Sequence, residues 1–453
     1  MKYLPNYDKG FYPMSIKLKE FNLAVKKEEN KTLKLCVERN DGYNYIYQLQ
    51  IFSSPDKQEE NYSVVERIIK SMLWVVGGYK IYICGDDYVY DKIKSDYTNK
   101  GRRAFDVDFM QTVYEQPFEV IKASEKDFPA ANNCSVKIGG HLDGCRIGFD
   151  AGGSDRKVSA VVDGKVVYSE EVVWFPKSNS DYHYHYDGIM QAMKTAASKM
   201  PRVDAIGVSS AGVYINNKIM VASLFLKVPK EDYKPHVQNM YIDIAKEIGA
   251  PLEVANDGDV TALAGAIDLK DNCVLGIAMG TSEAVGYINK NGLLNGWLSE
   301  VAFVPVDYNK DAMVDEWSGD YGCGVKYFSQ DSVIKLAESA GYKFDDKSSP
   351  AEKLKVIQKL MESGNDMARK IYEDIGIYLG YAIPYYAEFY QIKHLLLLGR
   401  VTSGEGGSII VENAKKVLKE EFPELSDINI TMPDESNKRV GQSIAAASLA
   451  EIK

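Results

Sequence analysis

The spacing of apolar residues predicts a mixed α and β region at the start of the chain. Apolar and polar positions alternate over Leu33–Arg39 and Tyr43–Ile51, with the turn residues Asn40–Gly42 between them, which is typical of a strand pair. Glu66–Val76 has the spacing of a helix, and the apolar run Lys80–Cys84 that follows favours a further strand. We therefore expect a small sheet accompanied by a helix in this region.

Two further sets of elements follow, and in each set hairpin strands come before alternating helices and strands. The first set comprises strands Arg146–Phe149, Lys157–Val162 and Lys165–Val173, helix Gly188–Lys199 and strand Ala205–Val208. The second set comprises strands Cys273–Met279 and Ala284–Asn289, helices Gln330–Ala340, Ala351–Ser363 and Asp366–Glu388, and strand His394–Leu398. This order predicts an α/β fold of two similar lobes with a cleft between them.

The composition of residues 124–145 indicates a domain boundary, because Gly, Pro, Asn and Ser are mixed there between two more regular regions. We expect an N-terminal α+β accessory domain at 1–145. A first lobe at 146–258 would be completed by a C-terminal helix within 438–453, and a second lobe would occupy 259–437. That last helix carries small residues on the face expected to pack on the first lobe.

Composition narrows the classes of protein to which the chain can belong. Its 453 residues, 45% hydrophobic and 26% charged, are typical of a soluble globular protein with more than one domain. With 64 acidic and 54 basic residues the net charge is −10, which opposes binding to a phosphate backbone. The two signs balance over 1–145. Nucleic acid is therefore not an expected partner.

The cysteines and the apolar runs bear on the compartment. The 6 cysteines form no C-x-x-C pair, so neither a zinc framework nor a disulfide scaffold is indicated. The start of the chain carries charges and a proline where a signal peptide needs an apolar run. Ser71–Gly77 and His394–Gly399 are far shorter than the roughly 20 apolar residues of a membrane-spanning helix. We expect a cytoplasmic protein with no membrane segment.

A first candidate for phosphate binding is the turn in I-G-F-D-A-G-G-S-D-R-K. Gly152, Gly153 and Ser154 follow a strand end, where backbone N–H groups can approach phosphate oxygens because glycine has no side chain in the way. Asp150, at the end of that strand, could hold Mg²⁺ through water. The alternative is an ordinary glycine hairpin with a solvated aspartate.

A second turn of the same kind lies in A-M-G-T-S-E-A-V-G, where Gly280, Thr281 and Ser282 lie between two predicted strands. One such turn is a weak signal. Two turns in chain order, each at the head of a predicted lobe, would allow both lobes to bind the same polyphosphate. We therefore expect the pair to bind phosphate groups.

A candidate general base lies between these turns. In P-L-E-V-A-N-D-G-D-V-T-A-L an apolar strand ends at Asn256, and a helix of small residues begins at Asp257. A carboxylate at this corner can accept the proton of an attacking hydroxyl during phosphoryl transfer. The alternative role for Asp257 is the helix N-cap, which Asp259 could also fill.

From about residue 146 to the end, the chain resembles the ROK family of sugar kinases within the actin-like, hexokinase-like ATPases. The D-x-G-G-T turn of that family is matched by Asp150–Ser154, with Ser154 in place of Thr. Its Gly-Thr-Gly turn is matched by Gly280 and Thr281, with Ser282 in place of the last glycine. The catalytic Asp of its N-D-A-N-x-A-A-L element falls on Asp257. The resemblance implies two actin-like (ribonuclease H-like) lobes.

Further matches carry other expected contacts. I-G-V-S-S-A-G-V looks like the sugar-side loop, which implies substrate contacts at Ser210 and Gly212. N-G-L-L-N-G is a further match to the family. L-L-L-L-G-R-V is similar to the adenosine-side strand and turn, which implies nucleotide contacts at Gly399 and Arg400, although Arg400 stands where a second glycine is usual.

The departures from the family pattern concern the sugar and the metal. The G-E-x-G-H element aligns with S-E-V-A-F, which keeps Glu300 as a sugar-binding carboxylate but has Phe303 in place of His. The cysteine-rich stretch keeps only Cys323, and Val325 replaces a sugar-binding Glu. We expect no structural zinc, since such a site needs four ligands. The lost polar contacts also argue against assuming glucose as substrate.

Two other features are discounted as sites. His183 and His185, in D-Y-H-Y-H-Y, have the i, i+2 spacing of a strand face and could bind a metal only with further ligands. The 31 tyrosines are spread along the chain, so we expect them in half-buried and interface positions.

The expected function is an ATP-dependent kinase that phosphorylates a sugar or sugar-like hydroxyl compound with Mg²⁺. Asp257 would act as base, the two turns would hold the phosphates, and Asn256 with Glu300 would position the acceptor. A homodimer is left open. The main alternative is a non-catalytic ROK-like sugar sensor, although 1–145 shows no evident helix-turn-helix. A third is an ATPase that activates a dehydratase through an iron–sulfur cluster, for which Cys323 alone is a poor basis.

Overall fold

The computed structural model describes residues 1–132, 138–432, 441–442 and 444–452. They form two compact units. The N-terminal unit contains residues 1–132, 277–285 and 297–432, and the central unit contains residues 138–276, 286–296 and the described residues after 440. The three-part division into 1–145, 146–258 and 259–437 stays a proposal beside this grouping.

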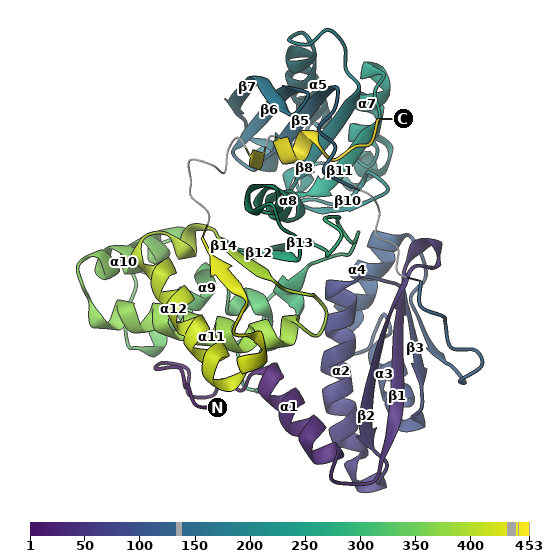
Figure 1. Ribbon diagram of the computed structural model, residues 1–453, viewed down its shortest axis with the longest axis vertical. Helices are drawn as coiled ribbons and strands as arrows, with labels where there is room; N and C mark the ends of the chain where they lie inside the picture. The colour runs from purple at the N-terminus through teal and green to yellow at the C-terminus, as the bar shows by residue number, and fades with distance from the viewer. Residues whose placement is uncertain (133–137, 433–440, 443, 453) are drawn as a thin grey trace. The chain divides into compact units, whose positions relative to one another are not determined.

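The central unit is built on a five-stranded sheet of order β11-β8-β5-β6-β7 (Figure 1). Its strands are β5 Cys145–Ala151, β6 Asp155–Val162, β7 Lys165–Val173, β8 Ala205–Ser210 and β11 Leu252–Asn256. β5, β6 and β7 are antiparallel neighbours, whereas β8 and β11 run parallel to β5. Strands β5 and β8 are buried almost throughout, but the edge strand β7 alternates between exposed and half-buried positions.

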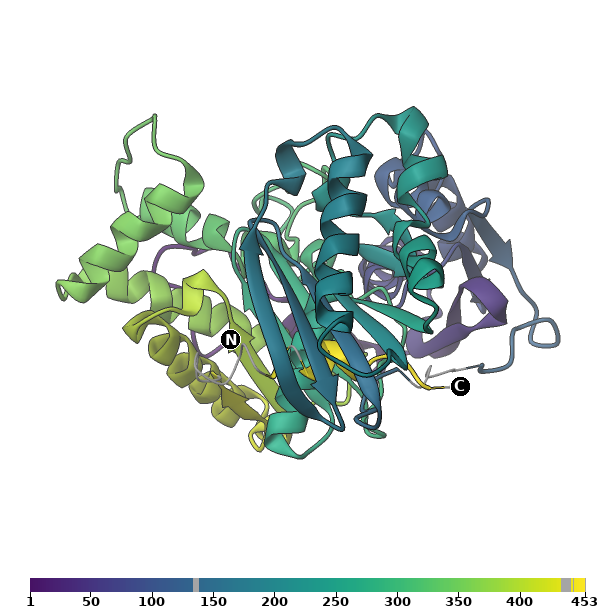
Figure 2. The ribbon, with the colours of Figure 1, turned by 90° about the horizontal axis from the view of Figure 1, so that it is seen from above.

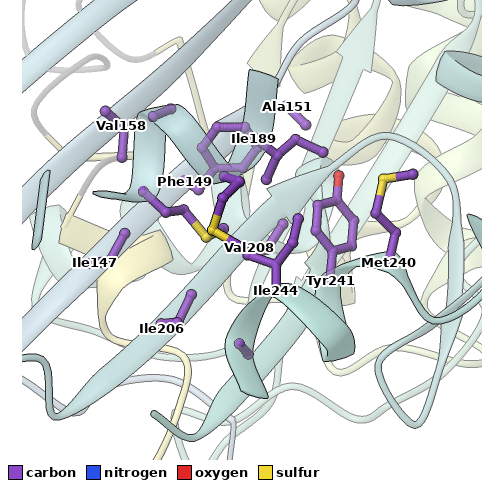
Figure 3. Packing of buried hydrophobic residues seen from close by; sticks show 14 of the residues in the cluster. Ile147, Phe149, Ala151, Val158, Ile189, Ile206, Val208, Met240, Tyr241 and Ile244 are labelled. Atoms are coloured by element: carbon purple, nitrogen blue, oxygen red, sulfur yellow. The ribbon is translucent and has the colours of Figure 1, made fainter. Parts of the chain in front are cut away.

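Helices α5 (Tyr182–Ala197) and α7 (Met240–Ile248) pack on one face of this sheet (Figure 2). Phe149 and Val208 from the strands meet Ile189 and Ile244 from the helices in a closed apolar cluster (Figure 3). Each such side chain contributes about 1.5–3 kcal/mol when fully buried. This core fixes the ends of β5, β8 and β11, where the candidate residues lie.

The D-Y-H-Y-H-Y run is helical, so the strand-face interpretation of its two histidines is wrong. Asp181 caps α5, because its carboxylate accepts a hydrogen bond of 2.9 Å from the backbone N–H of His183. His185 is buried and lies against backbone carbonyl oxygens, whereas His183 is exposed. The N-cap at Asp181 starts a helix at this point, and the alternating aromatic residues that follow are accommodated in its first turns.

The described C-terminal residues lie against the same sheet. Residues 441–442 and 444–447 are helical. A methyl group on Gly207 of β8 would collide with the carbonyl oxygen of Ala446, so the two backbones are in direct contact. Residues 438–440, 443 and 453 of the expected helix lie outside the described residues. The unit also contains α6 Lys230–Asp232, α8 Asp257–Leu269, β9 Val213–Ile215 and β10 Lys218–Val221.

The start of the N-terminal unit is a four-stranded sheet of order β2-β1-β3-β4. The strands are β1 Asn30–Glu38, β2 Asn44–Phe52, β3 Lys80–Cys84 and β4 Glu119–Lys122, and the helices are α1 Met14–Val25, α2 Gln58–Val75, α3 Asp87–Asp96 and α4 Ala104–Tyr114. The expected strand pair and helix are present, with longer ends. Every residue of α2 from Val64 to Val75 is buried, so this helix lies at the centre of the unit.

A second sheet of order β13-β12-β14-β15 and four long helices complete the fold. The strands are β12 Val274–Met279, β13 Glu283–Ile288, β14 His394–Leu398 and β15 Asn429–Thr431, and the helices are α9 Gln330–Ser339, α10 Pro350–Glu362, α11 Asp366–Tyr386 and α12 Glu405–Glu421. Helices α11 and α12 pack closely against each other, as Figure 1 shows. None of the helices among the described residues is both long and apolar enough to span a membrane.

The N-terminal sheet region and residues 297–323 are joined inside this unit. The ring centroid of Phe303 lies 4.2 Å from the ring centroid of Trp74 and 5.6 Å from the ring centroid of Phe105. The backbone N–H groups of residues 298–300 donate to the carbonyl oxygens of residues 74–76 at the end of α2. The N-terminal region therefore supports the loop that carries Glu300.

Candidate functional site

Asp257 lies at the corner where β11 ends and α8 begins. The side chain of Asn256 caps the helix, accepting a hydrogen bond of 2.7 Å from the backbone N–H of Gly258. Asp257 lies 3.0 Å from the same N–H, so it is not required as the cap. The amide of Asn256 also donates to the carbonyl oxygen of Gly212 at 2.8 Å. The corner thus leaves one carboxylate available for chemistry.

The electrostatic environment of Asp257 suits a general base. Burial and the negative charge of Asp150 raise the pKa of its carboxyl group, and with the opposing effects of backbone N–H groups and Lys177 the pKa is about 6. A base whose pKa lies near the working pH combines ionisation with useful proton affinity. The group is therefore ionised at neutral pH but close to protonation.

Asp150 is held at the end of β5. Its carboxylate accepts a hydrogen bond of 2.9 Å from the hydroxyl of Ser209, at the neighbouring position of β8. Burial raises the pKa of Asp150. The carboxylates of Asp150 and Asp257 together create a negative potential, which a divalent cation would offset. Mg²⁺ commonly uses one or two carboxylates with water. Asp150 therefore has the chemistry of the predicted magnesium residue.

The first turn, Gly152–Ser154, is supported from the segment that follows β7. The indole N–H of Trp174 donates to the carbonyl oxygen of Gly152 at 2.8 Å, and the backbone N–H of Trp174 donates to that of Ser154 at 3.1 Å. A methyl group on Gly152 would lie 2.6 Å from the carbonyl oxygen of Asp155, so only glycine fits there. Gly153 and Ser154 are exposed, as a ligand-binding turn requires.

Ser210 and Gly212 lie in a packed loop after β8. The hydroxyl of Ser210 accepts hydrogen bonds from Tyr214 at 2.6 Å and from Tyr241 at 3.2 Å. Gly212 has φ +137°, and a methyl group there would lie 2.5 Å from the carbonyl oxygen of Val221. The substrate contacts expected at these two residues stay predictions.

The second turn lies in the N-terminal unit. Gly280 donates its N–H to the carbonyl oxygen of Ser282 at 3.0 Å, which closes the turn. The guanidinium of Arg400 donates to the hydroxyl of Thr281 at 2.7 Å. Gly399 has φ +96°, and any side chain there would collide with the backbone of Met279. The structure thus brings the second turn together with the residues expected at the adenosine side.

Glu300 lies beside a second carboxyl group that the sequence analysis missed. Burial and the charge of Glu300 raise the pKa of Glu283 to about 8, although a hydrogen bond of 3.3 Å from Tyr386 opposes the shift. The other carboxyl oxygen of Glu283 has no hydrogen-bond partner among the described residues. A charged residue at the start of an otherwise apolar strand was the signal that could have identified it.

Cys323 is buried among charged residues of the same unit. Its sulfur lies 3.8 Å from the ammonium of Lys70 and 3.7 Å from the carbonyl oxygen of Asp320. Burial raises the pKa of this thiol to about 11. Across the described part of the chain, no three His, Cys, Asp or Glu side chains are grouped so that they could hold a metal ion.

A second residue missed from the sequence is Lys177, which lies close to the first turn and to Asp257. It follows Trp174-Phe175-Pro176, and no motif singles it out. The structure therefore brings Asp150, Asp257 and Lys177 together with the first turn in the central unit. Gly280–Ser282, Arg400 and Glu300 are in the N-terminal unit.

Comparison with solved structures identifies the fold. A ROK hexokinase from Thermus thermophilus is 15% identical, aligns over 67% of this chain and 97% of its own, and has a TM-score of 0.53. A ROK family transcriptional regulator, homologous to the E. coli MLC protein, is 17% identical, aligns over 68% of this chain and 79% of its own, and has a TM-score of 0.54. No curated protein matches the sequence.

These likenesses confirm the expected fold class, an α/β hexokinase-like fold of the actin-like ATPase type. The sequence model of the ROK family matches residues 146–450, about two thirds of the chain. The match begins at β5 and includes both glycine turns, Asp257 and the turn at Arg400. The chain therefore belongs to the ROK family.

Proposed function

We propose that the protein is an ATP-dependent kinase that transfers the γ-phosphate of ATP to a hydroxyl group of a sugar or sugar-like acceptor. The observation that carries this proposal is the environment of Asp257. Its carboxylate is free of the capping role, has a pKa raised to about 6, and lies in the same unit as Asp150 and the first glycine turn. This combination suits proton removal from a hydroxyl beside a polyphosphate.

In this proposal each group has a defined task. Asp257 accepts the hydroxyl proton, and the N–H groups of Gly152–Ser154 and Gly280–Ser282 donate to phosphate oxygens. Gly399 and Arg400 border the adenosine. Mg²⁺, held by Asp150 through water, supplies charge neutralisation for the phosphates. Asn256, Ser210, Gly212 and Glu300 contact the acceptor.

A non-catalytic sugar sensor is the second candidate, and the similarity to a ROK transcriptional regulator favours it. A DNA-binding head would need a helix with one exposed face for the major groove. Helix α2, the longest helix of the N-terminal sheet region, is instead buried over Val64–Val75. Helix α2 therefore offers no face that could serve as the recognition helix of a helix-turn-helix repressor.

We also propose a cytoplasmic location. Cys36, Cys84, Cys145 and Cys323 are free and buried, which is typical of proteins that fold in a reducing compartment.

The test is ADP release from purified protein with Mg²⁺, ATP and a panel of sugars, amino sugars and polyols. For the active acceptor, Asp257→Asn should reduce turnover by about 10³-fold or more while nucleotide affinity stays nearly the same, because only the base is lost. The matched control is Asp259→Asn. The Asp259 side chain accepts the N–H of Tyr287 at 3.2 Å, and an Asn carbonyl can do the same.

Saturable ADP release that depends on one acceptor class and on Asp257 would support the kinase. Sugar binding by calorimetry without any acceptor-dependent ADP release would instead favour the sensor. Equal turnover in Asp257→Asn and the wild type would contradict the assignment of the base.

A further inference from the structure

A short segment after β7, Trp174–Ser178, lies against the first glycine turn. Trp174 donates one hydrogen bond to each end of the turn, to Gly152 at 2.8 Å and to Ser154 at 3.1 Å. Trp174 itself is only 1% exposed. The segment and the turn therefore form one rigid structure, and side chains of the segment keep a fixed position relative to Gly153.

Lys177 extends over this turn. A methyl group placed on Gly153 would lie 2.9 Å from Cε and 3.0 Å from Nζ of Lys177. The absence of a side chain at Gly153 thus gives the lysine its position directly above the backbone. Lys177 is exposed, and within the described residues it has no ion-pair partner. Its charge is available to a ligand bound at the turn.

The buried side chain of His185 lies against the backbone of the Trp174–Ser178 segment. Nε2 of His185 lies 3.1 Å from the carbonyl oxygen of Pro176 and 3.2 Å from that of Leu224. Nδ1 lies 3.1 Å from the carbonyl oxygen of Asp181. Because carbonyl oxygens only accept hydrogen bonds, the tautomer of His185 protonated at Nε2 donates to Pro176 and Leu224 and ties the residue before Lys177 to α5.

The charge of Lys177 also reaches the predicted base. Lys177 lowers the pKa of Asp257, whereas burial and the charge of Asp150 raise it. Two other groups interact with Asp257: Asp259 on α8 and Tyr214 on β9. Of these titratable groups, only Lys177 is a cation, and it lies at the turn that would hold the phosphates.

We propose that Lys177 is a catalytic residue that binds the terminal phosphate oxygens of a nucleoside triphosphate held at the Gly152–Ser154 turn. This inference rests on the proposed kinase function and names a further group in the same site. A phosphate oxygen held by the turn would lie next to the ammonium, which would stabilise negative charge on the phosphoryl group during transfer. The same ammonium opposes the rise in the pKa of Asp257.

The experiment compares Lys177→Gln, Lys177→Arg and a control, Lys165→Gln, in the full-length protein. Lys165 is an exposed residue at the opposite end of the β6–β7 hairpin, where it pairs with Val162. With the active acceptor, Lys177→Gln should lower kcat by about 10²-fold, the usual effect of losing one charge-stabilising donor. Lys177→Arg should recover part of the loss, and Lys165→Gln should equal the wild type.

The pH dependence separates a charge effect from a structural one. Removing the cation raises the pKa of Asp257, so the acid limb of kcat should move to higher pH in Lys177→Gln but not in Lys165→Gln. A merely structural loss would lower kcat without moving this limb. An unchanged kcat, or an unchanged acid limb with no recovery in Lys177→Arg, would overturn the proposal for Lys177 and leave the kinase function intact.

A binding measurement keeps the inference testable if the wild type transfers no phosphate. Calorimetry with Mg-ATP and with AMP should then show that Lys177→Gln weakens ATP binding at least about tenfold and leaves AMP binding unchanged, since only ATP carries the terminal phosphate. Equal effects on both nucleotides, or no effect, would overturn the assignment of Lys177. Failure of transfer in the wild type would by itself count only against the kinase.

Discussion

Asp257 is half-buried and Glu283 is buried, and their surroundings give the two carboxyl groups different properties. Asp257 receives the N–H of Gly258 and the influence of Lys177, and its pKa rises only to about 6. Within the described part of the chain Glu283 has a single hydrogen bond, from Tyr386, and its pKa rises to about 8. At neutral pH the first group is ionised and the second is mainly a neutral acid. Glu283 should therefore govern stability rather than proton transfer.

We predict that Glu283→Gln removes part of the pH dependence of stability. Because the pKa of Glu283 is raised in the folded state, its contribution is present below about pH 4.5 and is lost as the pH rises through about 8. Gln resembles the neutral acid at every pH. Thermal unfolding should show the variant close to the wild type at pH 5 and more stable than the wild type at pH 8.

Glu362→Gln is the matched control, since Glu362 is exposed at the end of α10. Its unfolding temperature should follow that of the wild type at both pH values. A Glu283→Gln protein that loses stability equally at pH 5 and pH 8 would show that the carboxyl group is ionised in the folded protein.

At the residue scale, the sequence predicted candidate residues that belong to motifs, but not those whose position depends on contacts between distant parts of the chain. Asp150, Asp257 and the two glycine turns could be predicted, because strand ends, glycines and carboxylates follow one another in the chain. Lys177 could not, because its position depends on two hydrogen bonds, from the indole and the backbone N–H of Trp174, to a turn about 20 residues earlier. Whether each predicted residue acts as proposed stays a question for the variants.

The close packing of α11 on α12 depends on glycines at the contact. Gly376 and Gly380 lie one turn apart on α11, and methyl groups there would lie 2.7 Å from Cβ of Asn413 and 2.5 Å from Cβ of Val417. The absence of side chains at these positions allows the two helices to approach closely. The buried face of α11 includes Tyr378 and Tyr385, which are fully buried, whereas the sequence analysis expected tyrosines in half-buried and interface positions.

We predict that Gly380→Ala destabilises the protein, although alanine favours a helix over glycine by about 1 kcal/mol. The added methyl group forces α11 and α12 apart, and such overpacking typically costs about 1–3 kcal/mol or more. Urea unfolding should therefore show a lower midpoint. The control is Gly188→Ala in α5, where the methyl group would meet only the flexible end of Arg156 closely, so it should be neutral or mildly stabilising.

Elements were predictable wherever local periodicity and burial agree. β3, β7 and β14 have the bounds that their apolar patterns predicted. The beginning of α5 was missed because the alternating aromatic run has a strand-like period, and only the cap at Asp181 starts the helix. Helices α1 and α12 were not predicted, because their apolar positions become meaningful only against neighbours distant in sequence.

At the scale of the whole molecule, the N-terminal region is part of a larger compact unit. The family match begins at residue 146, and the boundary predicted at 124–145 follows from composition. The structure groups residues 1–132 with residues 297–432, through contacts such as Trp74 with Phe303. Sequence alone could not show this, since the partners lie more than two hundred residues apart.

A buried ionic network holds these distant segments together. Asp320 accepts hydrogen bonds from Arg67 at 3.1 Å and from Lys70 at 2.6 Å, and lies 2.8 Å from Arg103. Glu66 also pairs with Arg67 and Arg103. Burial alone would raise the pKa of Asp320, but the charges of Arg67 and Lys70 outweigh it and lower that pKa. Asp320 is thus the anionic centre contributed by the later part of the chain.

We predict that Asp320→Asn destabilises the N-terminal unit by about 3–5 kcal/mol, the typical cost of leaving buried charges unpaired. The matched control is Glu316→Gln on the same loop. Glu316 is exposed, and its partner Lys326 keeps Asp331 at 2.8 Å, so the cost should be about 0–1 kcal/mol. Urea unfolding followed by tryptophan fluorescence, in proteins carrying Trp174→Phe, measures both, because the three tryptophans that remain, Trp74, Trp297 and Trp317, belong to the N-terminal unit. A loss below 1 kcal/mol for Asp320→Asn would mean that apolar packing at Phe303, and not the network, holds the N-terminal region in place.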